Sequence, residues 1–317
     1  MDAELKEICD LMLGNYEELR STVGEKKEPE FLLTGANIFT AEMAHADGED
    51  VKAAMEIIKE RMNVLEQYSS KVEFFLECKM SRFEDPGEYV EEILEVCRMI
   101  QTGKKVTENN NILSAMMIID NALLTGAGDY EEVTSDTKEV FMALSDGEKG
   151  HEGELPFATA AALKGLDGEY MISREPVLRD YLRKGIRLDH ITVDIMGQCV
   201  SLINGDLEEN YNRFSRVASA LKKAKHSVGQ GKINLLLAQA TGFGIGEDEL
   251  VESIIEADDY LKQFKPFKGM MGLEAEFRRF IAILCVIRRL DEPDGLNSRL
   301  AAVMGIYITI LNATRTF

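Results

Sequence analysis

Four polar side chains lie inside otherwise apolar segments, where their types would allow chemistry: Glu42, Asp120, Asp194 and Gln239. A carboxyl group removed from water favours its neutral form, so its pKa rises toward the range that suits general acid or base catalysis. If the segments that carry these residues line one cavity, the carboxyls predict an active site or a small-molecule site. The simpler interpretation is that each side chain points to solvent or binds a neighbouring helix end.

A second pattern is the pair His190 and Asp194, which are four residues apart and would share one face of a helix. Such a pair supplies half of a metal site, but two further ligands are needed and the sequence nominates none. A hydrogen-bonded pair is the simpler interpretation. We therefore predict no metal, no cofactor and no catalytic residue, and we keep five residues as pocket candidates: Glu42, Asp120, His190, Asp194 and Gln239.

A glycine triplet, Gly242, Gly244 and Gly246, precedes a predicted helix as in a dinucleotide-binding turn. Its spacing is one residue short, and acidic residues from Glu247 onward occupy the helix start, where a pyrophosphate needs positive potential. The triplet therefore predicts a turn between helices. The chain contains no phosphate-binding loop, nucleophile elbow, HExxH or EF-hand pattern, which favours a protein that is not an enzyme.

The formal net charge is −20, from 56 acidic and 36 basic side chains, which opposes binding to nucleic acid or to an anionic membrane. The lysines at 222, 223 and 225 could still bind an anion locally, although a solvated last helical turn explains them as well. Five widely spaced cysteines in apolar surroundings indicate reduced thiols. With an acidic N-terminus and no apolar run long enough for a bilayer, we expect a soluble cytoplasmic protein.

The elements that would position the candidate residues are clearest over residues 190–225. A densely apolar segment ends at Gly205, and an amphipathic segment follows with Leu207, Tyr211, Phe214, Ala218 and Leu221 at helical spacing. This pattern predicts a buried helix, a tight turn and a half-buried helix.

The same unit recurs along the chain. A glycine directly before an acidic residue occurs at intervals of 37 to 41 residues, at Gly48, Gly87, Gly128, Gly168, Gly205 and Gly246. Glycine suits a left-handed helix C-cap, and the acidic residue suits the start of the next helix. A period near 40 residues with two helices per unit predicts stacked helical hairpins.

We therefore expect an all-α fold in one domain, residues 1–317, shaped as an α-solenoid or, if the curve closes, an α/α toroid. The polar segment 145–154 is the candidate for a midpoint hinge. In the fourth unit Pro176 interrupts the pattern, so Ser173 is expected to cap a shorter second helix.

The order of landmarks resembles a family of uncharacterised, mainly bacterial all-helical proteins of about this length, catalogued only as a domain of unknown function. The matching segments are residues 15–19 (NYEEL), His151 leading into residues 156–163 (PFATAAAL), residues 183–188 (RKGIRL) and residues 229–233 (GQGKI). The resemblance implies an all-helical fold and no activity, cofactor or catalytic residue.

Two functions follow as hypotheses. The first is a non-catalytic helical-repeat scaffold that binds a peptide or protein partner along its concave face. The second is an α/α-toroid enzyme or small-molecule binder that uses the carboxylates of the inner helices. The absence of tryptophan argues against carbohydrate substrates for the second. The sequence leaves the oligomeric state open.

Overall fold

The computed structural model describes the chain except for ten segments. These are residues 25–26, 66–69, 102–108, 127–129, 145–154, 175–204, 230–232, 269–272, 293–294 and 314–317, and the side chains of 62–65, 70–71 and 311–313. The proposed hinge at 145–154, the landmarks at His151 and 183–188, and the candidates His190 and Asp194 lie outside the described residues.

Every regular element of the described residues is a helix. The helices are α1 (Ala3–Val23), α2 (Pro29–Ala41), α3 (Gly48–Leu65), α4 (Ser70–Met80), α5 (Pro86–Ile100), α6 (Asn109–Thr125), α7 (Glu131–Leu144), α8 (Leu155–Leu163), α11 (Leu207–Lys223), α12 (Asn234–Thr241), α13 (Glu247–Leu261), α14 (Ala275–Leu290) and α15 (Leu296–Ala313). The all-helical prediction is confirmed for this part of the chain.

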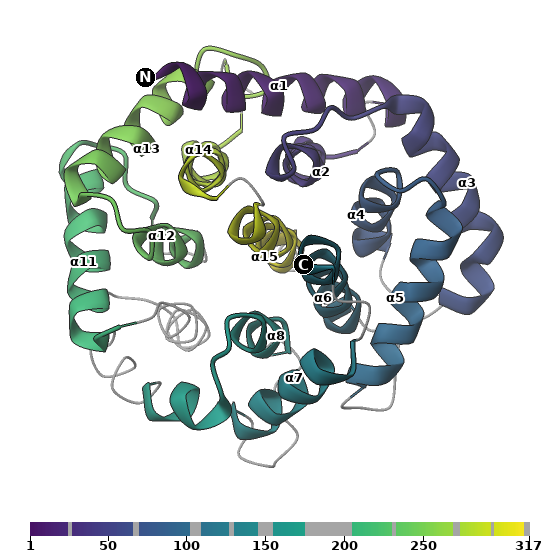
Figure 1. Ribbon diagram of the computed structural model, residues 1–317. Coiled ribbons are helices and arrows are strands. Elements are labelled where there is room, and N and C mark those ends of the chain that lie inside the picture. The colour runs from purple at the N-terminus through teal and green to yellow at the C-terminus, as the bar shows by residue number, and fades with distance from the viewer. Residues whose placement is uncertain are drawn as a thin grey trace.

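The described helices lie in two layers around a single central helix (Figure 1). Helices α1, α3, α5, α7, α11 and α13 lie outside, and α2, α4, α6, α8, α12 and α14 lie inside, so consecutive helices alternate between the layers. Helix α15 breaks the alternation, because it follows the inner helix α14 and lies in the middle. It packs against α2, α4, α6, α12 and α14.

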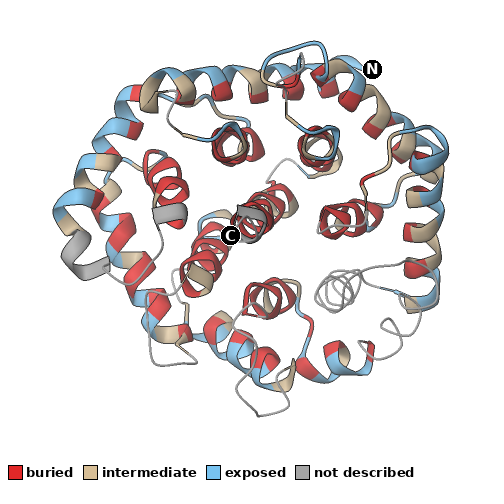
Figure 2. Cartoon of the chain, turned by 180° about the vertical axis from the view of Figure 1, so that it is seen from behind, coloured by how far each residue is buried: buried red, intermediate tan, exposed pale blue. Residues whose placement is uncertain are grey.

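The burial pattern explains which helix goes where. Outer helices are amphipathic and bury one stripe, as α11 does with Tyr211, Phe214, Val217 and Leu221. The inner helix α2 has no exposed polar face, and every residue from Phe31 to Ala41 is buried. Figure 2 shows the two patterns, with striped outer helices and mostly buried inner ones. A helix without a polar face must be covered on all sides, so it belongs to the inner layer.

The first and last outer helices of the chain meet. Helix α1 packs against α13 and α14, and Tyr260 donates a hydrogen bond to Asp10 Oδ1 at 2.5 Å. Arg289 Nε lies 2.8 Å from the Asp2 carboxylate, and the amino group of Met1 pairs with Glu256. The N-terminus is therefore held against the end of the helical array (Figure 1).

The glycines that precede acidic residues do not act mainly as left-handed caps, which corrects the expectation from the sequence. Of the five that the structure describes, only Gly205 has a positive φ, 107°. Three others face the preceding outer helix at very short range. A Cβ atom would lie 2.3 Å from Thr22 Oγ1 at Gly48, 2.9 Å from Arg61 Nη2 at Gly87, and 2.5 Å from Ala143 Cβ at Gly168. At Gly168 the near atom is a methyl carbon that cannot rotate away, so this glycine allows close packing between helices, whereas at Gly87 the near atom is the far end of the flexible Arg61 side chain.

A side chain on one outer helix often donates a hydrogen bond to the backbone of the turn that precedes the next outer helix. The donor and the acceptor are 26 to 31 residues apart in the chain. In each pair the first residue's side chain donates to the second residue's carbonyl: Asn15 and Ala44, Arg61 and Gly87, Arg174 and Gly205, and Arg213 and Phe243. Hydrogen bonds of this kind satisfy carbonyl groups at a helix-to-helix turn.

Two further findings concern single elements. Ser173 does not cap a helix, because residues 168–174 are helical and its hydroxyl bonds the Tyr170 carbonyl within that helix at 2.8 Å. A serine hydroxyl can bond the backbone inside a helix as well as at its start, so its type alone did not locate the helix end. None of the helices in the described part of the chain combines the length and apolarity that a bilayer crossing requires.

Candidate functional site

Two of the predicted pocket residues meet in the interior, in a group that we call the central ion cluster: Glu42, Lys79, Asp120 and Arg299. Lys79 pairs with Glu42 and lies 2.6 Å from Asp120 Oδ1. Arg299 Nη1 lies 2.9 Å from Glu42 Oε1 and 3.6 Å from Asp120 Oδ1. Two carboxylates thus share two cations.

Each member of the cluster comes from a different helix. Glu42 directly follows α2, Lys79 is in the last turn of α4, Asp120 is in α6, and Arg299 is in the first turn of α15. Arg82 adds a more exposed cation, with Nε 3.3 Å from Glu42 Oε2. The negative end of the α4 dipole favours Lys79, whereas Arg299 lies at the positive end of α15 and depends on its carboxylate partners.

The two carboxyls respond differently to this environment. Burial acts to raise the pKa of Glu42, but Lys79, Arg299 and Arg82 together outweigh burial and leave the pKa lowered. Burial raises the pKa of Asp120 more than Lys79 lowers it, and the nearby Glu42 raises it further. Glu42 is therefore the charged partner of the cations, and Asp120 is the group whose proton is held more firmly.

The third described candidate, Gln239 of α12, lies at the same end of α15. Its amide donates to the Asn297 carbonyl at 3.3 Å, and Lys164, directly after α8, lies 3.3 Å from Asn297 Oδ1. Burial lowers the pKa of Lys164. Asp291 completes this group by accepting from the Ser298 backbone at 2.6 Å. Polar residues of α12 and of the ends of α8 and α14 therefore gather around the first turn of α15.

The cluster encloses almost no free space. The cavity lined by Glu42, Lys79, Asp120 and Arg299 has a volume of about 10 Å³, closed on its other side by apolar residues such as Met116 and Val303. This is about the space of one water molecule. With its charges paired and no room for a substrate, the central ion cluster joins α15 to the inner helices.

Sequence reasoning found the two carboxyls but not their partners, Lys79 and Arg299. Lys79 stands in the apolar segment around Leu76 and Met80, and Arg299 precedes the apolar run of α15. A lone cation beside an apolar run is the available signal, because a buried cation needs a carboxylate partner. Nothing in the local pattern indicates which carboxylate that is.

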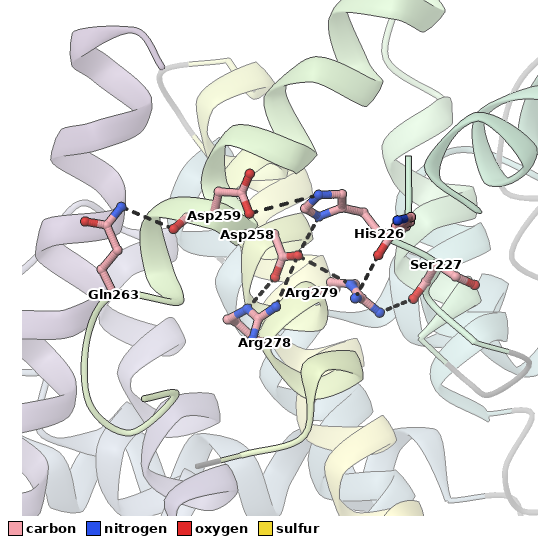
Figure 3. Close-up of polar contacts among 8 residues, drawn as sticks. His226, Ser227, Asp258, Asp259, Gln263, Arg278 and Arg279 are labelled. Carbon is pink, nitrogen blue, oxygen red and sulfur yellow. Dashed lines mark hydrogen bonds and ion pairs between the residues drawn. The ribbon is translucent and has the colours of Figure 1, made fainter. Parts of the chain in front are cut away.

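A second polar group connects α13 and α14 with the segment after α11 (Figure 3). Asp258 is fully buried, and its Oδ1 lies 2.5 Å from Arg278 Nε. Its Oδ2 lies 2.7 Å from His226 Nδ1 and 3.4 Å from Arg279 Nε. Arg279 also donates to the backbone carbonyls of Ser227 and, at 3.2 Å, Lys225. We call this group the Asp258 cluster.

His226, Asp258 and Asp259 also place potential metal-ligand atoms within 4.8 Å of one another. Two guanidinium groups already bind the Asp258 carboxylate, and their positive charges oppose a further cation at the same oxygens. The geometry therefore fits a structural ion-pair cluster better than a metal site. Sequence reasoning did not identify it, because its contacts join residues that are 20 to 54 positions apart in the chain.

A surface groove runs between the outer helices α11 and α13, with a volume of about 440 Å³. Small residues of α11 form its floor, among them Ser215, Ser219 and Ala220, and Val251 of α13 lies opposite. Arg216 crosses it to Glu247 at 2.7 Å, and Lys223 lines it near the end of α11. The volume is within the range of ligand-binding clefts.

The four cysteines in the described residues are buried free thiols: Cys9, Cys78, Cys97 and Cys285. Burial raises the pKa of Cys97 to about 12, so this thiol stays protonated and unreactive. The cysteines add no candidate nucleophile.

No protein-family model, no curated protein and no solved structure matches this chain. The resemblance to a domain family of unknown function therefore stays a prediction.

Proposed function

We propose that the chain is a non-catalytic helical-repeat scaffold that binds a peptide or protein partner in the outer groove between α11 and α13. The observation that carries the proposal is the position of α15, which fills the middle of the helical array (Figure 1). A partner cannot bind along an inner face that the chain itself covers. The outer surface is the part that remains accessible.

The proposal includes the arrangement of the helices: hairpins of about 40 residues repeat along the chain and close into an α/α toroid. It is supported by the alternation of outer and inner helices and by the contact between α1 and α13. The recurring bond from one outer helix to the turn of the next supports it as well. In repeat proteins each unit contacts mainly its neighbours and presents an extended surface to partners.

The comparison of available volumes favours the groove over the interior. Ligand-binding clefts typically enclose about 300 to 1,000 Å³. The groove has about 440 Å³, whereas the cavity at the central ion cluster has about 10 Å³. The acidic composition and the buried free thiols support a cytoplasmic location, without nucleic acid or a membrane as partner.

The proposal is tested with a display library of peptides encoded by the source genome, selected against the full chain. Binding of the selected peptides is then measured for Ser219→Trp, which fills the groove, and for Ala53→Trp on the exposed face of α3 as the matched control. We expect Ser219→Trp to weaken binding by about tenfold or more and the control to leave it unchanged. Peptides that bind both variants equally well would refute the groove.

The alternative is an enzyme or small-molecule binder that uses the inner carboxylates, and one observation favours it. Glu42 and Asp120 lie close enough to share Lys79, and the pKa of Asp120 is raised by its burial. Such a function requires α15 to move, because no substrate fits the present cavity. Asp120→Asn separates the two functions: a catalyst would lose activity while folded, and a scaffold would change only in stability.

A further inference from the structure

A group of exposed lysines lies where α11 and α13 end: Lys222, Lys223 and Lys225 on one side, and Lys262 on the other. Lys225 precedes His226, which contacts Asp258, and Lys262 is one turn beyond Asp258. The contact between His226 and Asp258 therefore links the two segments that carry these lysines (Figure 3). We call these four residues the lysine patch.

The charge of the lysine patch is not cancelled by the residues beneath it. Asp258 is the buried carboxylate below, and Arg278 and Arg279 already balance it. Asp259 is the exposed carboxylate beside the patch, and its Oδ1 lies 4.0 Å from His226 Nε2. Among the described residues, no carboxylate forms an ion pair with any of the four lysines. A concentration of positive charge thus persists on a chain whose net charge is −20.

The lysine patch is continuous with the groove, because Lys223 belongs to both. The start of α13 lines the groove with Glu247, which Arg216 already compensates, and with the exposed Asp248. The exposed charges along the groove therefore differ in sign, positive at Lys223 and negative at Asp248. A bound segment experiences positive potential at Lys223 and negative potential at Asp248.

We infer that the peptide bound in this groove carries an acidic stretch that pairs with Lys222, Lys223 and Lys225. This inference rests on the proposed function and adds the chemistry of the partner. An acidic segment is repelled by most of this surface and attracted at the lysine patch, so charge complementarity selects both its position and its direction in the groove. A basic segment would instead be attracted to the acidic surface elsewhere.

The test measures fluorescence anisotropy at low ionic strength with two labelled probes, a short alternating glutamate and alanine peptide and its lysine and alanine counterpart. The variant carries Lys222→Gln, Lys223→Gln and Lys225→Gln. The matched control removes three exposed lysines elsewhere, with Lys52→Gln and Lys59→Gln on α3 and Lys138→Gln on α7. We expect the glutamate peptide to bind the unmodified chain and to bind the triple variant about tenfold more weakly, with the control unchanged. Added salt should weaken the binding, because the contacts are exposed.

Failure of the glutamate peptide to bind, or equal binding to the triple variant, would overturn the inference. Ser219→Trp distinguishes this failure from that of the proposed function. If binding requires an open groove but not the lysines, the groove stands and the acidic partner is refuted. If binding requires the lysines but tolerates Ser219→Trp, the acidic ligand stands and the groove is refuted.

Discussion

At the scale of single residues, the buried carboxylates of this chain differ in whether a cation compensates them. Asp258 and Glu42 each contact two or more cations, so the cost of removing them from water is offset. Glu77 of α4 is the contrasting case. Its side chain is buried, and its nearest charges include the like charge of Glu73 on the same helix.

Glu77 makes the stability of the fold depend on pH. Burial and the neighbouring Glu73 raise its pKa to about 7, against the opposing effect of Lys27 and Lys59. In the unfolded chain the group ionises with its ordinary pKa near 4.3. Between about pH 4 and pH 7 the folded state therefore binds more protons, and stability falls as the pH rises. This destabilisation is absent below the unfolded pKa and reaches about 3 kcal/mol above pH 7.

We expect Glu77→Gln to remove this dependence. The variant should be more stable than the unmodified chain at pH 8, by up to about 3 kcal/mol, and similar to it at pH 4. Urea unfolding at a series of pH values measures the difference. Glu73→Gln is a second variant to compare, because it removes only the like charge beside Glu77 and should raise the free energy of unfolding by less. Parallel stability curves for Glu77→Gln and the unmodified chain would contradict the assignment.

At the scale of elements, the approach of one outer helix to the next depends on the space around single glycines, and most clearly at Gly168. At Gly168 the obstacle is Ala143 Cβ, 2.5 Å from where a new Cβ would lie. A methyl group on α7 cannot rotate away, so the two helices must separate. Gly14 of α1 is different, because nothing lies within 4 Å of its added Cβ.

The same substitution should consequently have opposite effects at these two sites. Gly168→Ala should lower the free energy of unfolding by about 1 to 3 kcal/mol through overpacking. Gly14→Ala should raise it by up to about 1 kcal/mol, since alanine is the better helix former at an open position. Denaturant unfolding of both variants measures the two changes. A stable Gly168→Ala protein would show that α7 and the helix after Gly168 do not depend on this contact.

At the scale of the whole molecule, each outer helix covers apolar faces of its neighbours. Helix α11 packs against α12 and α13 and buries Tyr211, Phe214, Val217 and Leu221 against them. Helix α15 plays the corresponding role for the interior, where it covers the inner helices that would otherwise surround an open space.

Deletion of residues 205–225 should therefore lower the melting temperature sharply and broaden the transition, because it exposes the apolar faces of α12 and α13. Thermal unfolding followed by circular dichroism measures the change. Ser219→Trp serves as the control, since it alters the surface of α11 and keeps its buried stripe. A deletion variant that melts like the full chain would refute mutual support between neighbouring helices.

The sequence by itself determined the helices and their burial. Helical spacing is a local property, so the stripe of α11 could be predicted, and its residues Tyr211, Phe214 and Leu221 are buried in the structure. Tertiary structure decided what those helices enclose. Lys79 meets Glu42 and Asp120 across 37 and 41 positions, and Arg299 meets Glu42 across 257. Helix α15 lies in the middle, where it packs against α2, α4, α6, α12 and α14. A local pattern shows that a charge needs a partner or an apolar helix needs cover, whereas the identity of the partner depends on contacts between distant segments.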